Sequence, residues 1–186
     1  MPLTFHAVAI NPLIRGLNNL SAILTKGEQH AIANGIDPNE YISARLVSDM
    51  DPLPQQIYRC TDAAKLLVSR ITSLDPLPLP DVEKTFPEFQ ARIAKVISYL
   101  EGIDPKEFEG KEEKEVVIYT KGPPGSEVRY ANSSEAKDYV SYYAHPNFWF
   151  HVVTAYALLR MKGVDVGKLD YLNGAKLAQI TVVPKE

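Results

Sequence analysis

The sequence lacks several features that would assign a class of function directly. It contains one cysteine in 186 residues, which excludes an intrachain disulfide. It has no run approaching the roughly 20 apolar residues that a membrane-spanning helix needs. Its net charge is −3 and its lysines and arginines are not clustered, whereas proteins that bind a nucleic-acid backbone carry a basic patch. We therefore expect no nucleic-acid partner and no membrane partner.

Motifs of nucleotide binding, acyl hydrolysis and metalloproteolysis are also missing. The chain contains no Gly-x-x-x-x-Gly-Lys-Ser/Thr, no Gly-x-Gly-x-x-Gly, no Gly-x-Ser-x-Gly and no His-Glu-x-x-His. The first residues show no basic region followed by an apolar one, so we expect no secretory leader and a soluble, cytoplasmic protein. The single cysteine, Cys60, is predicted to be a small buried helix residue, with a nucleophilic thiol as the alternative.

The hydrophobic pattern predicts four long amphipathic helices. Apolar residues recur every three or four positions over residues 10–24, 57–71 and 86–100, and a fourth helix is expected from about Ser133 to Met161. Pro12 either lies in the first turn of the first helix or marks a kink in it. Glycines that follow these segments are typical of helix ends.

The segments between the long helices carry their own signals. Asp37-Pro-Asn-Glu40 predicts a short helix to about residue 46, and Asp104-Pro-Lys-Glu107 predicts one further turn. The three prolines of residues 75–80 predict a stiff, extended connector. Thr85-Phe-Pro-Glu88 is typical of a capping box. Residues 115–120 and 127–131 are rich in β-forming residues and predict a hairpin with a longer loop.

Together these elements predict a mainly α protein. We expect a four-helix bundle with short extra helices and a small β-hairpin between the third and fourth long helices. Residues 1–173 are predicted to form a single domain, and residues 174–186 a C-terminal tail with 178–183 extended.

The densest aromatic block of the chain is His145-Pro-Asn-Phe-Trp-Phe-His151, on the fourth predicted helix. Asn147 and His151 are four residues apart and therefore lie on one helix face. Pro146 has no N–H, so the carbonyl of Tyr142 should lose its helical partner and join this polar cluster. We predict a pocket for a small organic ligand, with His151 as acid, base or ligand. The alternative is a kinked core helix whose histidine is satisfied by one hydrogen bond.

Four further residues are predicted to contribute to ligand binding. Tyr156 on the same helix can donate a hydrogen bond through its hydroxyl. Gln56 and Arg15 each border the apolar stripe of their own helix and can therefore face a bundle pocket. His6 lies near the start of the first helix, where it can approach the fourth. His151 is the candidate catalytic residue, and whether the protein is an enzyme stays open.

Several blocks of the chain resemble one uncharacterised family. They are Leu13-Ile-Arg-Gly-Leu-Asn-Asn-Leu20, Ala44-Arg-Leu46, Pro146-Asn-Phe-Trp-Phe-His-Val-Val-Thr-Ala-Tyr156 and Gly167-Lys-Leu-Asp170. They resemble the DUF1993 family, which is grouped with the DinB/YfiT-like four-helix bundles. The resemblance covers roughly residues 3–173 and implies the same bundle fold that the hydrophobic pattern predicts.

The resemblance also implies possible activities. Many members of the superfamily hold a divalent metal with three histidines, one on the second helix and two at His-x-x-x-His on the fourth, and some are thiol-dependent transferases or isomerases. In this chain Asn147 stands four residues before His151, Ala155 stands four after it, and the second helix has no histidine. One imidazole does not make a divalent site, so we predict no cofactor and no intact metal site.

Two alternatives to a ligand-binding pocket follow from this comparison. The first is a metal- or thiol-dependent transferase or isomerase of the DinB/YfiT type, and the second is a non-catalytic interaction module. By analogy with bundles of this kind, we also expect a homodimer formed through helix faces.

Overall fold

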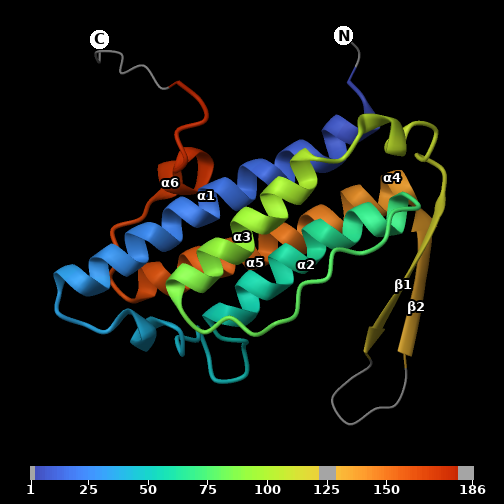
Figure 1. The fold of residues 1–186 in the computed structure, drawn as a ribbon. Coiled ribbons are helices and arrows are strands. Elements are labelled where there is room, and N and C mark those ends of the chain that lie inside the picture. The colour runs from blue at the N-terminus through green and yellow to red at the C-terminus, as the bar shows by residue number, and fades with distance from the viewer. Residues whose placement is uncertain (1–2, 122–128, 180–186) are drawn as a thin grey trace, which may run out of the picture.

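The computed structural model describes residues 3–121 and 129–179 and confirms the four predicted long helices. They are α1 (Phe5–Ala33), α2 (Leu53–Ile71), α3 (Phe86–Glu101) and α5 (His145–Met161), and they form a bundle (Figure 1). Their buried faces contribute to one hydrophobic cluster. The predicted fold class, mainly α with a small β-hairpin, is therefore confirmed.

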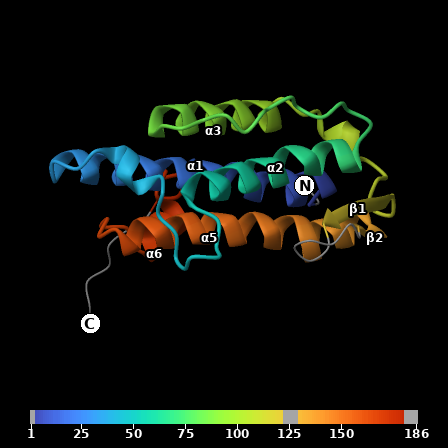
Figure 2. The same cartoon turned by 90° about the horizontal axis from the view of Figure 1, so that it is seen from below.

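The packing order of the four helices places two of them on a diagonal. α1 packs against α3 and α5, and α2 packs against the same two helices, whereas α1 and α2 have few contacts. Figure 2 shows α3 and α5 on opposite sides of α1 and α2. The colours of Figure 1 show that α1 and α5 run in one direction and that α2 and α3 run in the other. Because α2 and α3 are parallel, the chain between them must cross the length of the bundle.

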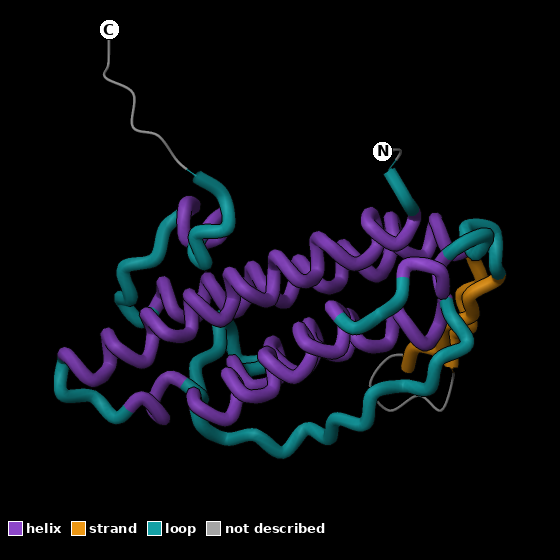
Figure 3. Tube along the Cα trace, turned by 45° about the horizontal axis from the view of Figure 1, so that its top comes forward, coloured by secondary structure: helices purple, strands orange, loops and turns teal. Residues whose placement is uncertain are grey.

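Residues 72–85 make this crossing as an extended loop (Figure 3). The prediction of a stiff, extended connector is confirmed. Prolines fix the backbone near the extended conformation and remove donors, so this segment cannot become helical. At its end Thr85 accepts a hydrogen bond from the Glu88 N–H, and the Glu88 carboxylate accepts from the Thr85 N–H, so the predicted capping box of α3 is present.

Arg92 of α3 holds the crossing segment against the bundle. Its side chain is fully buried and forms ion pairs with Asp81 (2.8 Å), Glu83 (3.0 Å) and Asp62 (3.4 Å). It also donates to the carbonyl oxygen of Pro80 at 2.9 Å. Burying a guanidinium is costly unless it is paired and hydrogen-bonded, and these four partners meet that requirement. The sequence pattern did not indicate this role, because an arginine beside an apolar stripe resembles any solvated position.

The first helix begins earlier than expected. α1 starts at Phe5, where the Thr4 hydroxyl accepts a hydrogen bond from the Ala7 N–H at 3.1 Å. Pro12 lies inside the helix, so the alternative in which the helix starts near Asn11 is wrong. The cap at Thr4 satisfies a donor that would otherwise have no intrahelical partner, which explains the earlier start.

The two Asp-Pro segments form short 3₁₀ helices, η1 (Pro38–Tyr41) and η2 (Pro105–Phe108). Asp37 and Asp104 cap them by accepting hydrogen bonds from the backbone N–H two residues on. The predicted extension of the first to residue 46 is wrong. Its last residue, Tyr41, is buried in the core, and the Tyr41 hydroxyl hydrogen-bonds His30 at 2.9 Å.

The predicted hairpin is formed by β1 (Glu115–Lys121) and β2 (Arg129–Glu135). The strands are antiparallel, and the register pairs Glu115 with Glu135. Residues 133–135, expected at the start of the fourth helix, belong to β2 because they pair with β1. The predicted turn of residues 121–126 lies almost wholly outside the described residues.

A continuous helical segment follows β2. It consists of α4 (Ala136–Asp138), the π-helix η3 (Tyr139–Ala144) and α5. The His145 N–H donates to the Val140 carbonyl, five residues back, immediately before Pro146. The interruption expected from the proline is therefore a π-helical turn. Such turns are frequent at functional sites.

The residues after α5 contain a helix that sequence analysis missed. α6 (Lys168–Asn173) packs against α1, and the Asp170 carboxylate accepts from the Gly167 N–H at 2.8 Å. Of the segment expected to be extended, 178–183, only residues 178 and 179 are described, and neither is in a strand. In the described parts of the chain, no helix has both the length and the apolar character needed to cross a bilayer.

Cys60 is fully buried on α2, as predicted, and burial raises the pKa of its thiol to about 12. The thiolate is the nucleophilic form of cysteine, so the nucleophile alternative is disfavoured. We expect the native protein to react with a thiol-specific disulfide reagent at pH 8 about a thousandfold more slowly than an exposed thiol. The measurement follows the released chromophore, with the urea-denatured protein as the positive control. Fast labelling of the native state would contradict the burial of Cys60.

Candidate functional site

The candidate site lies between α2 and the continuous helix formed by η3 and α5. Gln56 near the start of α2 contacts His151 of α5, while Arg70 near its end contacts Tyr139 of η3, so the two faces run antiparallel. A pocket of about 290 Å³, open to solvent, lies between them. It is lined by Arg59, Asp62, Ala63, Leu66 and Arg70 of α2 and by Tyr139, Tyr143, Ala144, Asn147 and His151 opposite.

Both rows of lining residues follow helical spacing. The lining positions of α2 are adjacent or separated by three or four residues. The same spacing holds for the lining positions of η3 and α5, so each row occupies one face of its helix. Ala63, Leu66 and Ala144 supply the apolar part of the lining, and the other seven lining residues are polar or charged.

His151 is held in a defined tautomer by a chain of hydrogen bonds. Its Nδ1 lies 2.8 Å from Oε1 of Gln56, and Nε2 of Gln56 donates to the Asp51 carbonyl at 2.8 Å. Because the amide nitrogen of Gln56 donates to the Asp51 carbonyl, the amide oxygen of Gln56 faces His151, where it must accept a hydrogen bond. Nδ1 therefore carries the proton and Nε2 carries a lone pair. Within residues 3–121 and 129–179, no protein group donates to Nε2.

The imidazole of His151 is neutral near pH 7. Burial and, to a smaller extent, the positive charge of Arg59 lower its pKa to about 4, while Asp51 acts in the opposite direction. Removing a charged imidazolium from water is unfavourable, and a nearby cation adds to that cost. A neutral ring with an available Nε2 can accept a hydrogen bond or a proton from a molecule in the pocket.

Two of the predicted site residues meet in the pocket, and a third supports them. Asn147 and His151 both line it, as their spacing of four residues indicated. Gln56 does not line the pocket, although we expected it to bind ligand. It is 2% exposed and lies behind His151, so it fixes the ring through Nδ1. Tyr142, whose carbonyl was expected in the cluster, has 80% of its surface exposed and does not line the pocket.

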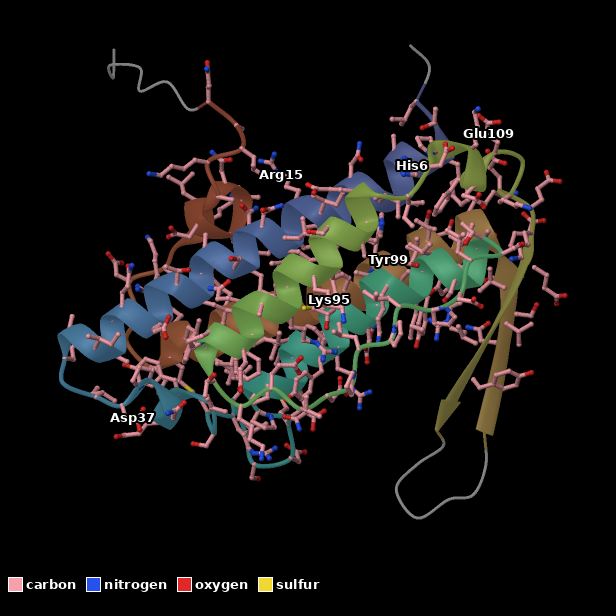
Figure 4. The ribbon with its side chains drawn as sticks, in the orientation of Figure 1. His6, Arg15, Asp37, Lys95, Tyr99 and Glu109 are labelled. Carbon is pink, nitrogen blue, oxygen red and sulfur yellow. The ribbon has the colours of Figure 1, made fainter. Side chains whose placement is uncertain are left out.

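The other three predicted residues lie elsewhere. The Tyr156 hydroxyl donates to the Val166 carbonyl at 3.3 Å, and Arg15 donates to the Leu172 carbonyl at 2.9 Å. Figure 4 shows Arg15 on the side of α1 that faces α6. His6 packs edge-on against Phe108 of η2, with 5.4 Å between the ring centroids, at the far end of α1. The structure therefore does not bring Tyr156, Arg15 and His6 to His151.

Sequence analysis missed the pocket residues Arg59, Arg70 and Tyr139. The signal that could have found them is their position on the helix faces that also carry Asp62 and Asn147. Arg70 Nη1 donates to the Tyr139 hydroxyl at 2.8 Å, and its guanidinium lies 5.6 Å from the centre of that ring. This contact joins two residues that are 69 positions apart in the sequence, so no local pattern encodes it.

The donors around His151 do not fit the three-histidine metal site that the superfamily resemblance implies. On α2 the donor that faces His151 is Gln56, and its oxygen is already bonded to Nδ1. Ala155, one turn after His151, has no donor at all. In the part of the chain that the structure describes, no three His, Cys, Asp or Glu side chains gather in a way that could hold a metal ion. Asn147 and a single imidazole are too few ligands for a divalent site.

The helical bundle with its crossing connector has a DinB-like fold. The chain is similar to the crystal structure of a DinB family member protein from Shewanella denitrificans, with 30% sequence identity and a TM-score of 0.78. The match covers 96% of this chain and 95% of that chain.

The family model described as Domain of unknown function (DUF1993) matches residues 5–172, and the chain belongs to this family. The family resemblance indicated by the sequence blocks is confirmed. A comparison with curated proteins finds no match.

Proposed function

We propose that this protein binds a small organic ligand in the pocket between α2 and α5, with Nε2 of His151 as the acceptor of a hydrogen bond or proton from that ligand. The observation that carries the proposal is the hydrogen-bond chain from the Asp51 carbonyl through Gln56 to Nδ1. This chain fixes the ring and leaves its basic nitrogen to the pocket. A histidine with a purely structural role needs only a satisfied ring sealed in the core.

The supporting chemistry is that of a preorganised base. A general base must be neutral at the working pH and within hydrogen-bond reach of the proton it accepts. Burial keeps His151 neutral at pH 7, and Gln56 supplies the partner that orients the ring. Asn147, one turn away on the same pocket wall, offers an amide donor and acceptor for orienting the ligand.

Histidine-selective NMR tests this proposal. A library of several hundred neutral and charged fragments is screened while the imidazole Cε1–H signals are recorded. We expect binding fragments to shift the His151 signal and to leave the His145 signal unchanged, because Nε2 of His145 is already bonded to the Ala9 carbonyl at 3.0 Å outside this pocket. His151→Gln is expected to abolish the binding of these fragments. A library in which no fragment shifts His151 would reject the proposal.

A further inference from the structure

Two arginines line the pocket without a carboxylate partner. Arg59 forms no hydrogen bond or ion pair with any residue in the described ranges. Arg70 uses only Nη1, which donates to the Tyr139 hydroxyl, and it pairs with no acid among the same residues. Guanidinium groups that line a pocket with free donors are suited to carboxylate or phosphate oxygens.

The one acidic side chain of the pocket lining does not cancel this charge. Asp62 Oδ1 lies 3.1 Å from the Lys65 ammonium and 3.4 Å from the Arg92 guanidinium. Even when the charge of Asp62 is counted in full, two arginines face one carboxylate in the lining. The lining carries a net positive charge on a chain whose overall net charge is −3. This local excess of positive charge attracts an anion, whereas it does not favour a neutral ligand.

Arg70 is the better placed of the two for anchoring an anion. It is partly buried, and the Tyr139 hydroxyl and ring hold its guanidinium, so little side-chain freedom is lost on binding. Arg59 is exposed and lies at the other end of the pocket, about 16 Å away along the α2 axis for eleven residues at 1.5 Å each. The apolar side chains of Ala63, Leu66 and Ala144 lie between the two ends.

From this arrangement we infer that the ligand is a small organic acid, with its carboxylate on Arg70, its apolar body over Ala63, Leu66 and Ala144, and its far end towards His151. The inference rests on the proposed function, since it names the chemical class of the ligand of the same pocket. Arg59 adds attraction through its charge without holding the acid group. No bond is made or broken in this step, so it describes recognition alone.

A matched pair of probes tests the inference: 3-phenylpropanoate and its neutral amide, 3-phenylpropanamide. Their affinities are measured by calorimetry at low salt and by NMR titration of the Tyr139 ring signals, because the Tyr139 hydroxyl is bonded to Arg70, where the acid group is expected. We expect the acid to bind at least tenfold more tightly than the amide, because a charge-assisted hydrogen bond contributes roughly this factor. Raising the salt concentration should weaken the binding of the acid and leave the binding of the amide unchanged.

Variants of Arg70 separate the acid contact from the fold. Arg70→Gln is expected to lower the affinity for the acid about tenfold and to leave the affinity for the amide unchanged. Arg70→Lys should keep part of the affinity for the acid. Lys168→Gln, which removes the same charge outside the pocket, is the control and should change neither affinity. Melting temperatures show whether each variant is folded.

The outcomes distinguish this inference from the proposed function. Equal affinity for acid and amide would overturn the acid class and leave the ligand pocket standing. An acid affinity unchanged in Arg70→Gln would overturn the anchoring role of Arg70. If neither probe bound while neutral fragments shifted His151, the acid class would again be wrong and the pocket right.

Discussion

Replacing Arg92 by methionine is expected to lower the free energy of unfolding by about 3–5 kcal/mol, the usual effect of removing one partner from a buried charge network. Methionine fills a similar length but offers no charge and no donors. Asp62, Asp81 and Glu83 would then face one another without the guanidinium that now lies 2.8–3.4 Å from each. The Pro80 carbonyl would also lose its donor, so the connector would no longer be held to α3.

Chemical denaturation monitored by circular dichroism gives this value, and Lys95→Met is the matched control. Lys95 lies one turn further along α3, is exposed, and makes a single hydrogen bond of 3.4 Å to the Pro78 carbonyl (Figure 4). Its substitution should cost less than about 0.5 kcal/mol. Similar stability losses for the two variants would show that Arg92 does not organise the connector.

Replacing Gln56 by glutamate is expected to raise the pKa of His151 by about 1 to 3 pH units from its value of about 4. The carboxylate would take the place of the amide oxygen that now lies 2.8 Å from Nδ1. It would favour the imidazolium through its charge and still accept the Nδ1 proton. The carboxylate cannot replace the hydrogen bond that Nε2 of Gln56 donates to the Asp51 carbonyl, so the variant loses that bond while the ring begins to titrate closer to neutral pH.

The same substitution should change how stability depends on pH. In the native protein the pKa of His151 lies at about 4, below the ordinary value of 6.5, so between these pH values the unfolded chain binds a proton that the folded chain does not. The stability due to neutral His151 is therefore present above pH 6.5 and lost as the pH falls towards 4, by about 1–2 kcal/mol once screening by solvent at the partly exposed ring is included. In Gln56→Glu the two pKa values come together and most of this loss should disappear.

Histidine NMR titration gives the pKa, and urea denaturation between pH 4 and 7 gives the stability. Gln55→Glu is the control, because it adds the same charge one residue earlier, at a side chain with no hydrogen bond in the described structure. We expect a much smaller change in the pKa of His151 in that variant. An unchanged pKa in Gln56→Glu would contradict direct contact between residues 56 and 151.

The sequence was most informative where structure depends on neighbouring residues. The apolar stripe of α2 was predicted at Ile57, Cys60 and Leu67, and all three are fully buried. The capping box at Thr85 was predicted because both of its hydrogen bonds form within four residues. The start of the fourth helix was predicted wrongly, because Ser133 and its neighbours are held in β2 by pairing with β1, a contact that lies outside the local pattern.

In the candidate site too, local spacing predicted some features and helix packing decided the others. The pairing of Asn147 with His151 follows from helix periodicity alone and is found in the pocket. Gln56 was identified as a site residue from its place beside the stripe of α2, but its role as the partner of Nδ1 depends on how α2 lies against α5. Tyr156 shares a helix with His151 yet hydrogen-bonds Val166 instead.

The sequence by itself determined the four long helices, their buried faces, the family and the two neighbouring polar residues of the pocket wall, because these depend on spacing along one chain segment. Only the tertiary structure decided which nitrogen of His151 carries the proton, that Arg70 meets Tyr139 across the pocket, and that Arg92 holds the connector. Each of these depends on side chains brought together by helix packing. The chemistry of this site therefore lies between helices, in contacts that no single segment encodes.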